Sequence, residues 1–139
     1  MKKRTPVSRI MTSNVVSLNK TDSLEEAEAL FKRHNIRHIP ITQGQQVIGI
    51  LSHTDLLRIS FADSIGYDDQ DVETTVYNMF TIEQVMVKKL ETVSSTTTVR
   101  EVAEILSKRE FHALPVVDNN VLVGIVTSTD LINFLLDQF

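Results

Sequence analysis

Apolar residues recur at helical spacing in two segments of the chain, residues 24–31 and 99–106. This spacing places apolar side chains on one face of a helix, the face that packs against a core. A hydroxyl residue precedes each segment and a glutamate follows that residue three positions later, in Ser23-x-x-Glu26 and Thr98-x-x-Glu101. Because this is the pattern of a capping box, we predict that a helix begins at each place.

Short β-rich runs surround both predicted helices in the same order. One run precedes each helix, and two runs joined by a turn rich in glycine or asparagine follow it. The runs are 15–18, 38–42 and 47–51 in the first part of the chain and 91–93, 114–117 and 121–126 in the second. A further helix is predicted to start near Thr54 in the first part and near Thr129 in the second.

This shared order reflects an internal repeat. A shift of 75 positions places 7–57 over 82–132 without a gap, with nine identities in 51 pairs, which indicates duplication of one structural unit. A lone unit of about 50–60 residues buries only a marginal fraction of its surface, so we expect the two units to pack face to face. The predicted fold is α/β (α+β), built twice as strand, helix, strand, strand, helix. The predicted domains are a first repeat at 1–60, a partly helical linker at 61–80 and a second repeat at 81–139.

The linker contains an acidic patch at 68–73, which we interpret as solvated chain rather than a divalent-cation site. After it, four apolar residues fall on one face of a short predicted helix that packs back onto the units. These residues are Val72, Val76, Met79 and Phe80.

Composition restricts the function classes. The chain has 42% hydrophobic and 23% charged residues, a net charge of −4 and no cysteine. Disulfides, thiolate nucleophiles and sulfur-rich metal sites are therefore excluded. No basic stripe carries aromatic residues, which argues against nucleic acid as a partner. No apolar run is long enough to insert into a membrane and no signal peptide is evident, so we expect a cytoplasmic protein.

The most informative stretch occurs twice, as Gly49-Ile-Leu-Ser-His-Thr-Asp55 and Gly124-Ile-Val-Thr-Ser-Thr-Asp130. Each copy is typical of the end of a strand that runs directly into a helix. The unpaired N–H groups of a helix start favour an anion, and a carboxylate there accepts hydrogen bonds from a ribose diol. The alternative is that Ser52, Thr127 and the two aspartates only cap the helices.

These two stretches, with the Ile39-Pro40 and Leu114-Pro115 strands and with Met11 and Met86, resemble the cystathionine-β-synthase (CBS) domain pair, or Bateman module. The resemblance implies two repeats about a pseudo-two-fold axis, with clefts for AMP, ADP, ATP or S-adenosylmethionine. It assigns Asp55 and Asp130 to ribose, and assigns phosphate or ribose contacts to the hydroxyl and basic residues. These residues are Ser52, Thr54, Thr127, Thr129, Arg37, His38 and His112.

The copies differ at the basic positions, because Ala113 stands where the family often has arginine. Alanine does not replace a guanidinium that binds phosphate through two hydrogen bonds. We therefore expect the two clefts to differ in occupancy.

For the adenine ring, the apolar residues next to the hydroxyls are placed to form a slot. They are Ile39, Ile50, Leu114 and Ile125.

Metal binding and catalysis have little support in the sequence. His34 and His38 are four apart, but Asn35 and the following strand interrupt the helix that would align them. His53 is expected to face solvent, and Met11 and Met86 to fill the core. No activated nucleophile or phosphate-binding glycine loop is evident, so a small enzyme is the least favoured reading.

We therefore predict a non-catalytic regulatory module that needs no cofactor, binds an adenosine-containing ligand and signals to a separate effector protein. The alternative is a ligand-free dimerisation or scaffold module. The segment 131–139 is apolar on more than one face, which indicates a second contact surface and favours a homodimer.

Overall fold

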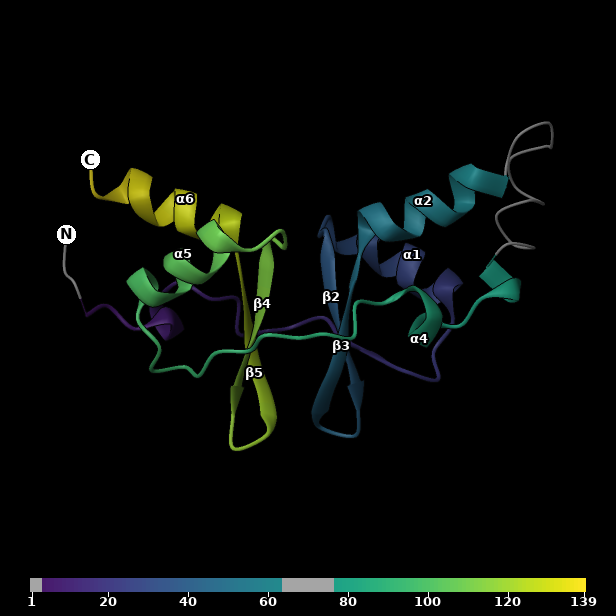
Figure 1. Ribbon diagram of the computed structural model, residues 1–139, viewed down its shortest axis with the longest axis horizontal. Coiled ribbons are helices and arrows are strands. Elements are labelled where there is room, and N and C mark those ends of the chain that lie inside the picture. The colour runs from purple at the N-terminus through teal and green to yellow at the C-terminus, as the bar shows by residue number, and fades with distance from the viewer. Residues whose placement is uncertain (1–3, 64–76) are drawn as a thin grey trace. The chain divides into compact units, whose positions relative to one another are not determined.

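The computed structural model of the protein describes residues 4–63 and 77–139, without the side chains of 60–63. The elements are η1 (Val7–Arg9), β1 (Leu18–Asn19), α1 (Leu24–His34), β2 (His38–Gln43), β3 (Gln46–Ser52), α2 (His53–Asp63), α4 (Ile82–Val85), α5 (Val99–Lys108), β4 (Ala113–Asp118), β5 (Val121–Thr127) and α6 (Ser128–Asp137). The predicted mixed α+β architecture with a twice-repeated order is confirmed (Figure 1).

Each repeat contributes one hairpin. Strands β2 and β3 are neighbours in a sheet whose third strand, β1, runs parallel to β2 with Leu18 opposite Ile41. Strands β4 and β5 pair antiparallel, with a bulge between Val116 and Val117. The predicted strand at 91–93 is shorter than expected, because it contributes a single parallel bridge, from Val93 to Val116.

The helix starts follow the predicted capping chemistry in most respects. Thr98 and Glu101 form a complete capping box at α5. At α1 the box is half formed: Ser23 Oγ accepts from the Glu26 N–H at 3.1 Å, and no reciprocal bond is recorded. Helix α1 ends at Asn35 in the left-handed conformation (φ 52°), as asparagine allows. Helices α2 and α6 begin at His53 and Ser128, one residue before the predicted starts.

The chain forms two compact units whose members do not follow the sequence repeats. The α1–α2 unit comprises Val16–Gly44 and Ile48–Leu90, and the α5–α6 unit comprises Met1–Val15, Gln45–Val47 and Glu91–Phe139. The segment that precedes the first strand of each repeat thus packs with the other repeat. The N-terminal segment belongs with the second repeat, and the segment containing α4 belongs with the first.

Backbone pairing and methionine packing fix the exchanged segments. In the α1–α2 unit, Ile50 and Val87 exchange two hydrogen bonds of 3.1 and 2.9 Å. In the α5–α6 unit, Thr12 and Ile125 do the same at 2.9 and 3.0 Å. The preceding methionines lie over the motif glycines, Met86 over Gly49 and Met11 over Gly124. A β-carbon on either glycine would overlap the methionine sulfur, so a larger residue at either position would force the methionine side chain to move.

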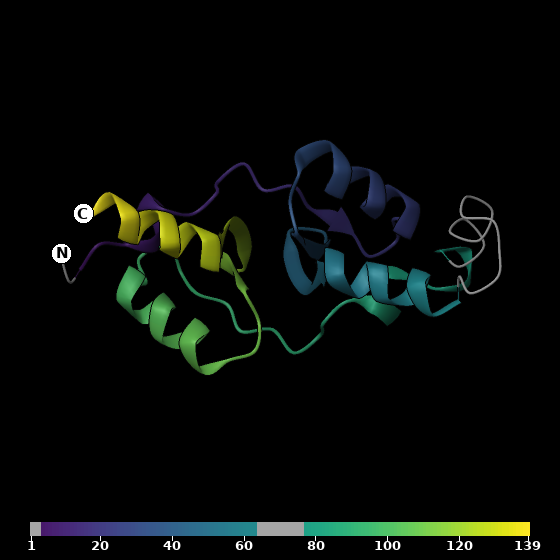
Figure 2. The same cartoon turned by 90° about the horizontal axis from the view of Figure 1, so that it is seen from above.

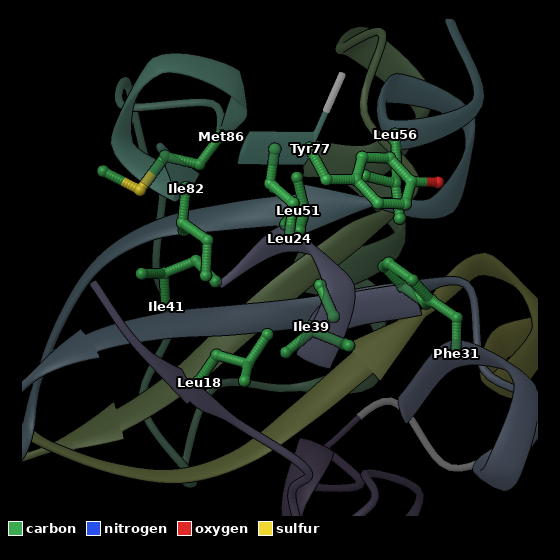
Figure 3. Close-up of a cluster of buried hydrophobic side chains, with 11 residues drawn as sticks. Leu18, Leu24, Phe31, Ile39, Ile41, Leu51, Leu56, Tyr77, Ile82 and Met86 are labelled. Carbon is green, nitrogen blue, oxygen red and sulfur yellow. The ribbon is translucent and has the colours of Figure 1, made fainter. Parts of the chain in front are cut away.

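Each unit has its own apolar core. In the α1–α2 unit the core lies between the hairpin, the two helices and the returning segment, as the close-up in Figure 3 shows. Helices α1 and α2 pack against each other, as do α5 and α6 (Figures 1 and 2). The second core combines exchanged and local residues. Its buried members are Val7, Val93, Val102, Leu114, Val116 and Val126.

At the end of the predicted linker, Tyr77 is buried in the α1–α2 core. Phe80 packs against the same core, as predicted, whereas Met79 is 66% exposed and does not. The prediction for Met79 was wrong because Tyr77, one position outside the predicted stripe, supplies the buried anchor. The predictions for Val72, Val76 and the acidic patch at 68–73 lie outside the described residues.

Helix α6 exposes much of its apolar surface, in accord with its mixed sequence pattern. Its exposed apolar residues and the terminal residue are Ile132, Leu135, Leu136 and Phe139. On α2, Leu57 is similarly exposed. Across residues 4–63 and 77–139, no helix combines the length and apolar character needed to cross a membrane.

Candidate functional site

The two glycine-to-aspartate stretches form strand-to-helix turns at the starts of α2 and α6. In both, the hydroxyl residue accepts a hydrogen bond from the aspartate N–H: Ser52 Oγ from Asp55 at 3.0 Å and Thr127 Oγ1 from Asp130 at 3.2 Å. The two hydroxyl groups therefore act as helix caps. The shared bond gives both turns the same local geometry despite the different hydroxyl residues.

The aspartate side chains, in contrast, have different partners. Asp130 Oδ2 accepts from the Thr127 N–H at 2.9 Å, which completes a capping box. Asp55 Oδ1 instead accepts from Arg58 Nη1 at 3.3 Å, one helical turn further along α2. A carboxylate has two oxygens. Among the described residues, one oxygen of each aspartate accepts a hydrogen bond, Oδ1 of Asp55 and Oδ2 of Asp130. Each turn thus retains a carboxylate oxygen able to accept a ribose hydroxyl.

A predicted basic residue lies next to each turn. The Arg37 carbonyl accepts from the His53 N–H at 2.8 Å, and the His112 carbonyl accepts from the Ser128 N–H at 2.9 Å. The two bonds join equivalent positions of the two repeats. Both Arg37 and His112 are exposed. The backbone therefore places a basic residue next to the start of each helix.

The other predicted residues divide by burial. Thr54 and Thr129 are exposed on the first turns of their helices, and His38 is half-buried at the start of β2. Ile50 and Ile125 retain 7% and 8% exposure. Ile39 and Leu114 are fully buried within the unit cores, which leaves no surface for a ligand.

Two histidine predictions are also resolved. His53 is half-buried rather than solvent-facing, because its ring lies 5.1 Å from that of Phe31. Helix α1 ends at His34, and His38 lies on β2, so the helix is interrupted between them as expected. In the part of the chain that the structure describes, no group of three or more histidine, aspartate or glutamate residues is placed to hold a metal ion.

Sequence reasoning missed two features of the site. Arg58 follows Asp55 by three positions, a spacing that places both on one helix face, and this signal was available in the sequence. The pairing of Ile50 with Val87 was not, since each repeat aligns with its own preceding segment and the exchange leaves the alignment unchanged.

Comparisons with known proteins agree with the repeat. The model of the CBS domain matches residues 7–62 and 82–137. The chain is 32% identical over 127 residues to a homoserine O-acetyltransferase of Methanocorpusculum labreanum, covering 90% of this chain but only 23% of that protein. It is 27% identical over 125 residues to the CBS domain-containing protein YhcV of Bacillus subtilis, covering 90% and 81% of the two chains.

Solved structures with the same architecture include a CBS domain pair with bound ligands. The pair of protein MJ0100, in complex with 5′-methylthioadenosine and S-adenosyl-L-methionine, matches with a TM-score of 0.80 and 28% identity over 97% of this chain and 98% of that one. The CBS domain of a membrane protein from Sphaerobacter thermophilus matches at 0.79 and 26%, over 94% and 88%. The resemblance inferred from the sequence is confirmed: the chain belongs to the CBS domain family and carries two copies of the domain in tandem.

Proposed function

We propose that this chain is a regulatory module that binds an adenosine-containing ligand at the strand-to-helix turns beginning α2 and α6. One observation carries the proposal. Both turns combine a capped helix start, a carboxylate and an exposed basic residue. The basic residue is Arg37 in one turn and His112 in the other, and in both its carbonyl accepts a hydrogen bond from the first N–H of the helix. A ribose diol needs an acceptor, which the carboxylate supplies, and a basic residue next to it can contact a phosphate or a ribose hydroxyl, so each turn offers groups suited to an adenosine compound.

The ligand class is supported by the complex of the 28% identical MJ0100 pair with two adenosine compounds. Asp55 and Asp130 are the proposed ribose acceptors. The polar and basic side chains proposed to contact phosphate or ribose are Ser52, Thr54, Thr127, Thr129, Arg37, His38 and His112. Ile50 and Ile125 are the proposed adenine contacts, because they keep exposed surface next to the turns.

The proposed output is non-catalytic. Ligand binding would favour one arrangement of the chain over another, which requires different affinities for the two arrangements. The effector would be a separate protein. The apolar residues exposed on α6 support a homodimer as the working form. They also favour the second candidate function, a ligand-free dimerisation module.

A thermal-shift titration with AMP, ADP, ATP and S-adenosylmethionine tests the proposal against this alternative. A ligand present at about 100 times its dissociation constant adds about 2.7 kcal/mol of stability, a readily measured shift. We expect at least one compound to raise the melting temperature. If none raises it and none produces heat in calorimetry, the scaffold function replaces the proposed one.

A further inference from the structure

The two turns carry different side chains at every equivalent basic position, and both arginines lie at the α2 turn. Around the α2 turn the chain places arginine and histidine at 37 and 38 and arginine at 58. The equivalent positions around the α6 turn hold histidine at 112, alanine at 113 and asparagine at 133. All residues of each set belong to the same compact unit, so the contrast does not depend on how the units are arranged.

Arg58 is held beside the proposed ribose acceptor. Its Nη1 lies 3.3 Å from Asp55 Oδ1, while its side chain remains 74% exposed. A guanidinium carries five N–H donors in a planar fork, so one bond to Asp55 orients the group and leaves other donors for an anion. At the equivalent place on α6, Asn133 is exposed and uncharged. A phosphate chain next to the ribose would therefore meet a guanidinium at this position on α2 and an uncharged amide at the equivalent position on α6.

The exchanged segments extend the same contrast. Val87 is fixed to Ile50 by two backbone hydrogen bonds, and Lys88 and Lys89 follow it directly, both exposed. In the other unit Thr12 is fixed to Ile125 in the same manner, and the residues that follow are the uncharged pair 13–14. Because the lysines come from the exchanged segment, they add positive potential to the unit that already carries Arg37 and Arg58.

From this asymmetry we propose that the two turns, if they bind adenosine compounds as proposed above, discriminate between ligands by charge. The α2 turn takes the polyphosphate form of the nucleotide, and the α6 turn takes an adenosine compound without phosphate. Arg58 is the specificity-determining residue of the α2 turn, and Asn133 is its uncharged counterpart. This inference rests on the proposed function, but a different experimental result would contradict each of them.

Reciprocal exchange of these two residues tests the proposal. Isothermal titration calorimetry would measure binding of ATP and of 5′-methylthioadenosine to the full chain, to Arg58→Asn and to Asn133→Arg. We expect Arg58→Asn to weaken ATP binding about tenfold, the effect of losing one charged hydrogen bond, with 5′-methylthioadenosine unchanged within about twofold. Asn133→Arg should strengthen ATP binding at the second turn. Arg58→Lys should retain part of the ATP affinity, since it keeps the charge but not the fork.

The matched control is Arg33→Asn, which removes an exposed arginine from the last turn of α1 in the same unit. It should leave both affinities unchanged, since Arg33 forms no recorded hydrogen bond or ion pair with the described residues of the turn. Equal loss of both ligands in Arg58→Asn, or an equal effect of Arg33→Asn, would overturn the assignment of Arg58. If the unaltered chain binds neither compound, the proposed function itself fails.

Discussion

The turns at α2 and α6 share their backbone and differ in their side chains. The bonds common to both are those that shape the turn: a hydroxyl caps the aspartate N–H, and the carbonyl of residue 37 or 112 accepts from the helix start. The differences concern charge, with Asp55 paired to Arg58 and Asp130 engaged in a capping box. Duplication has therefore preserved the backbone geometry of the turn and varied the charged groups around it.

The two sequence repeats also depend on each other's chain segments. Val7 is fully buried in the core that contains the second hairpin, and Ile82 is fully buried in the core that contains the first. A change at the start of one repeat should consequently destabilise the core that contains the hairpin of the other. The predictions below test these contrasts, starting with the largest expected effect.

Truncation of Ile82 should destabilise the α1–α2 unit. Ile82→Ala removes a fully buried side chain from that core and should cost about 2–5 kcal/mol. Hydrogen exchange should increase in residues 16–44 and 48–59 more than in 91–137. The matched variant Val7→Ala should give the reverse pattern at a smaller cost. Faster exchange confined to 91–137 in Ile82→Ala would contradict the segment exchange.

The motif glycines should tolerate alanine unequally. Gly49→Ala and Gly124→Ala each place a methyl group against a methionine sulfur, and overpacking of this kind costs about 1–3 kcal/mol. Met86 is 8% exposed while Met11 is half-buried, so we expect the larger loss at Gly49, where the side chain has less room to move. Urea denaturation of both variants measures the difference.

A double variant supplies the control for the glycine prediction. If the cost at Gly49 comes from Met86, Gly49→Ala combined with Met86→Ala should destabilise less than the sum of the two single changes. Strict additivity would show that the glycine is required for another reason.

Removing the aspartates should separate their structural roles. Asp130→Ala loses the bond to the Thr127 N–H and should cost about 1 kcal/mol, the usual effect of losing a cap. Asp55→Ala loses only an exposed ion pair, worth less than about 1 kcal/mol. Thermal denaturation without ligand should therefore rank Asp130→Ala as the less stable variant. The opposite ranking would show that Asp55 stabilises its turn more than its contacts suggest.

The smallest predicted effect concerns Glu28 of α1. Burial acts to raise the pKa of this carboxyl, but hydrogen bonds from Lys32 and Tyr77 outweigh it and lower the pKa below its usual 4.5. A lowered folded-state pKa stabilises the protein above the usual pKa, and that stability is lost as pH falls through the folded-state value. Glu28→Gln should therefore be less stable at pH 7 by about 1 kcal/mol or less, with the difference disappearing below pH 4.5.

The equivalent position on α5 is Ala103, which offers the control for this pH effect. Changing Ala103 to glutamine should alter stability by the same amount at pH 7 and at pH 4. A pH-independent difference between Glu28→Gln and the unaltered chain would contradict the contribution of the charged carboxylate.

Local signals predicted most of this fold. Hydroxyl caps, helical spacing and turn residues identified the helices and hairpins, since these features depend on neighbouring residues. The exchange of Met11 and Met86 between units could not be predicted, because it depends on where a connecting segment goes after it leaves its repeat. For the site, the sequence identified Ser52, Asp55 and Arg37 as candidates, but it did not settle which basic pair lies beside which aspartate; the bond between the Arg37 carbonyl and the His53 N–H is a tertiary contact. The sequence did not reveal that Ile39 and Leu114 are fully buried in the cores, since the sequence pattern of a strand is the same whether an apolar residue faces a core or a ligand.

Residue-resolved ligand binding tests the central claim, that the two turns are adenosine sites of different charge preference. A ¹H–¹⁵N NMR titration of the full chain with ATP, and separately with 5′-methylthioadenosine, would follow the amides of 52–58 and 127–133. The account predicts that ATP shifts the first set more strongly and that 5′-methylthioadenosine shifts the second more strongly. Saturating additions of both compounds that leave both sets of amides unshifted, or shift them equally, would contradict it.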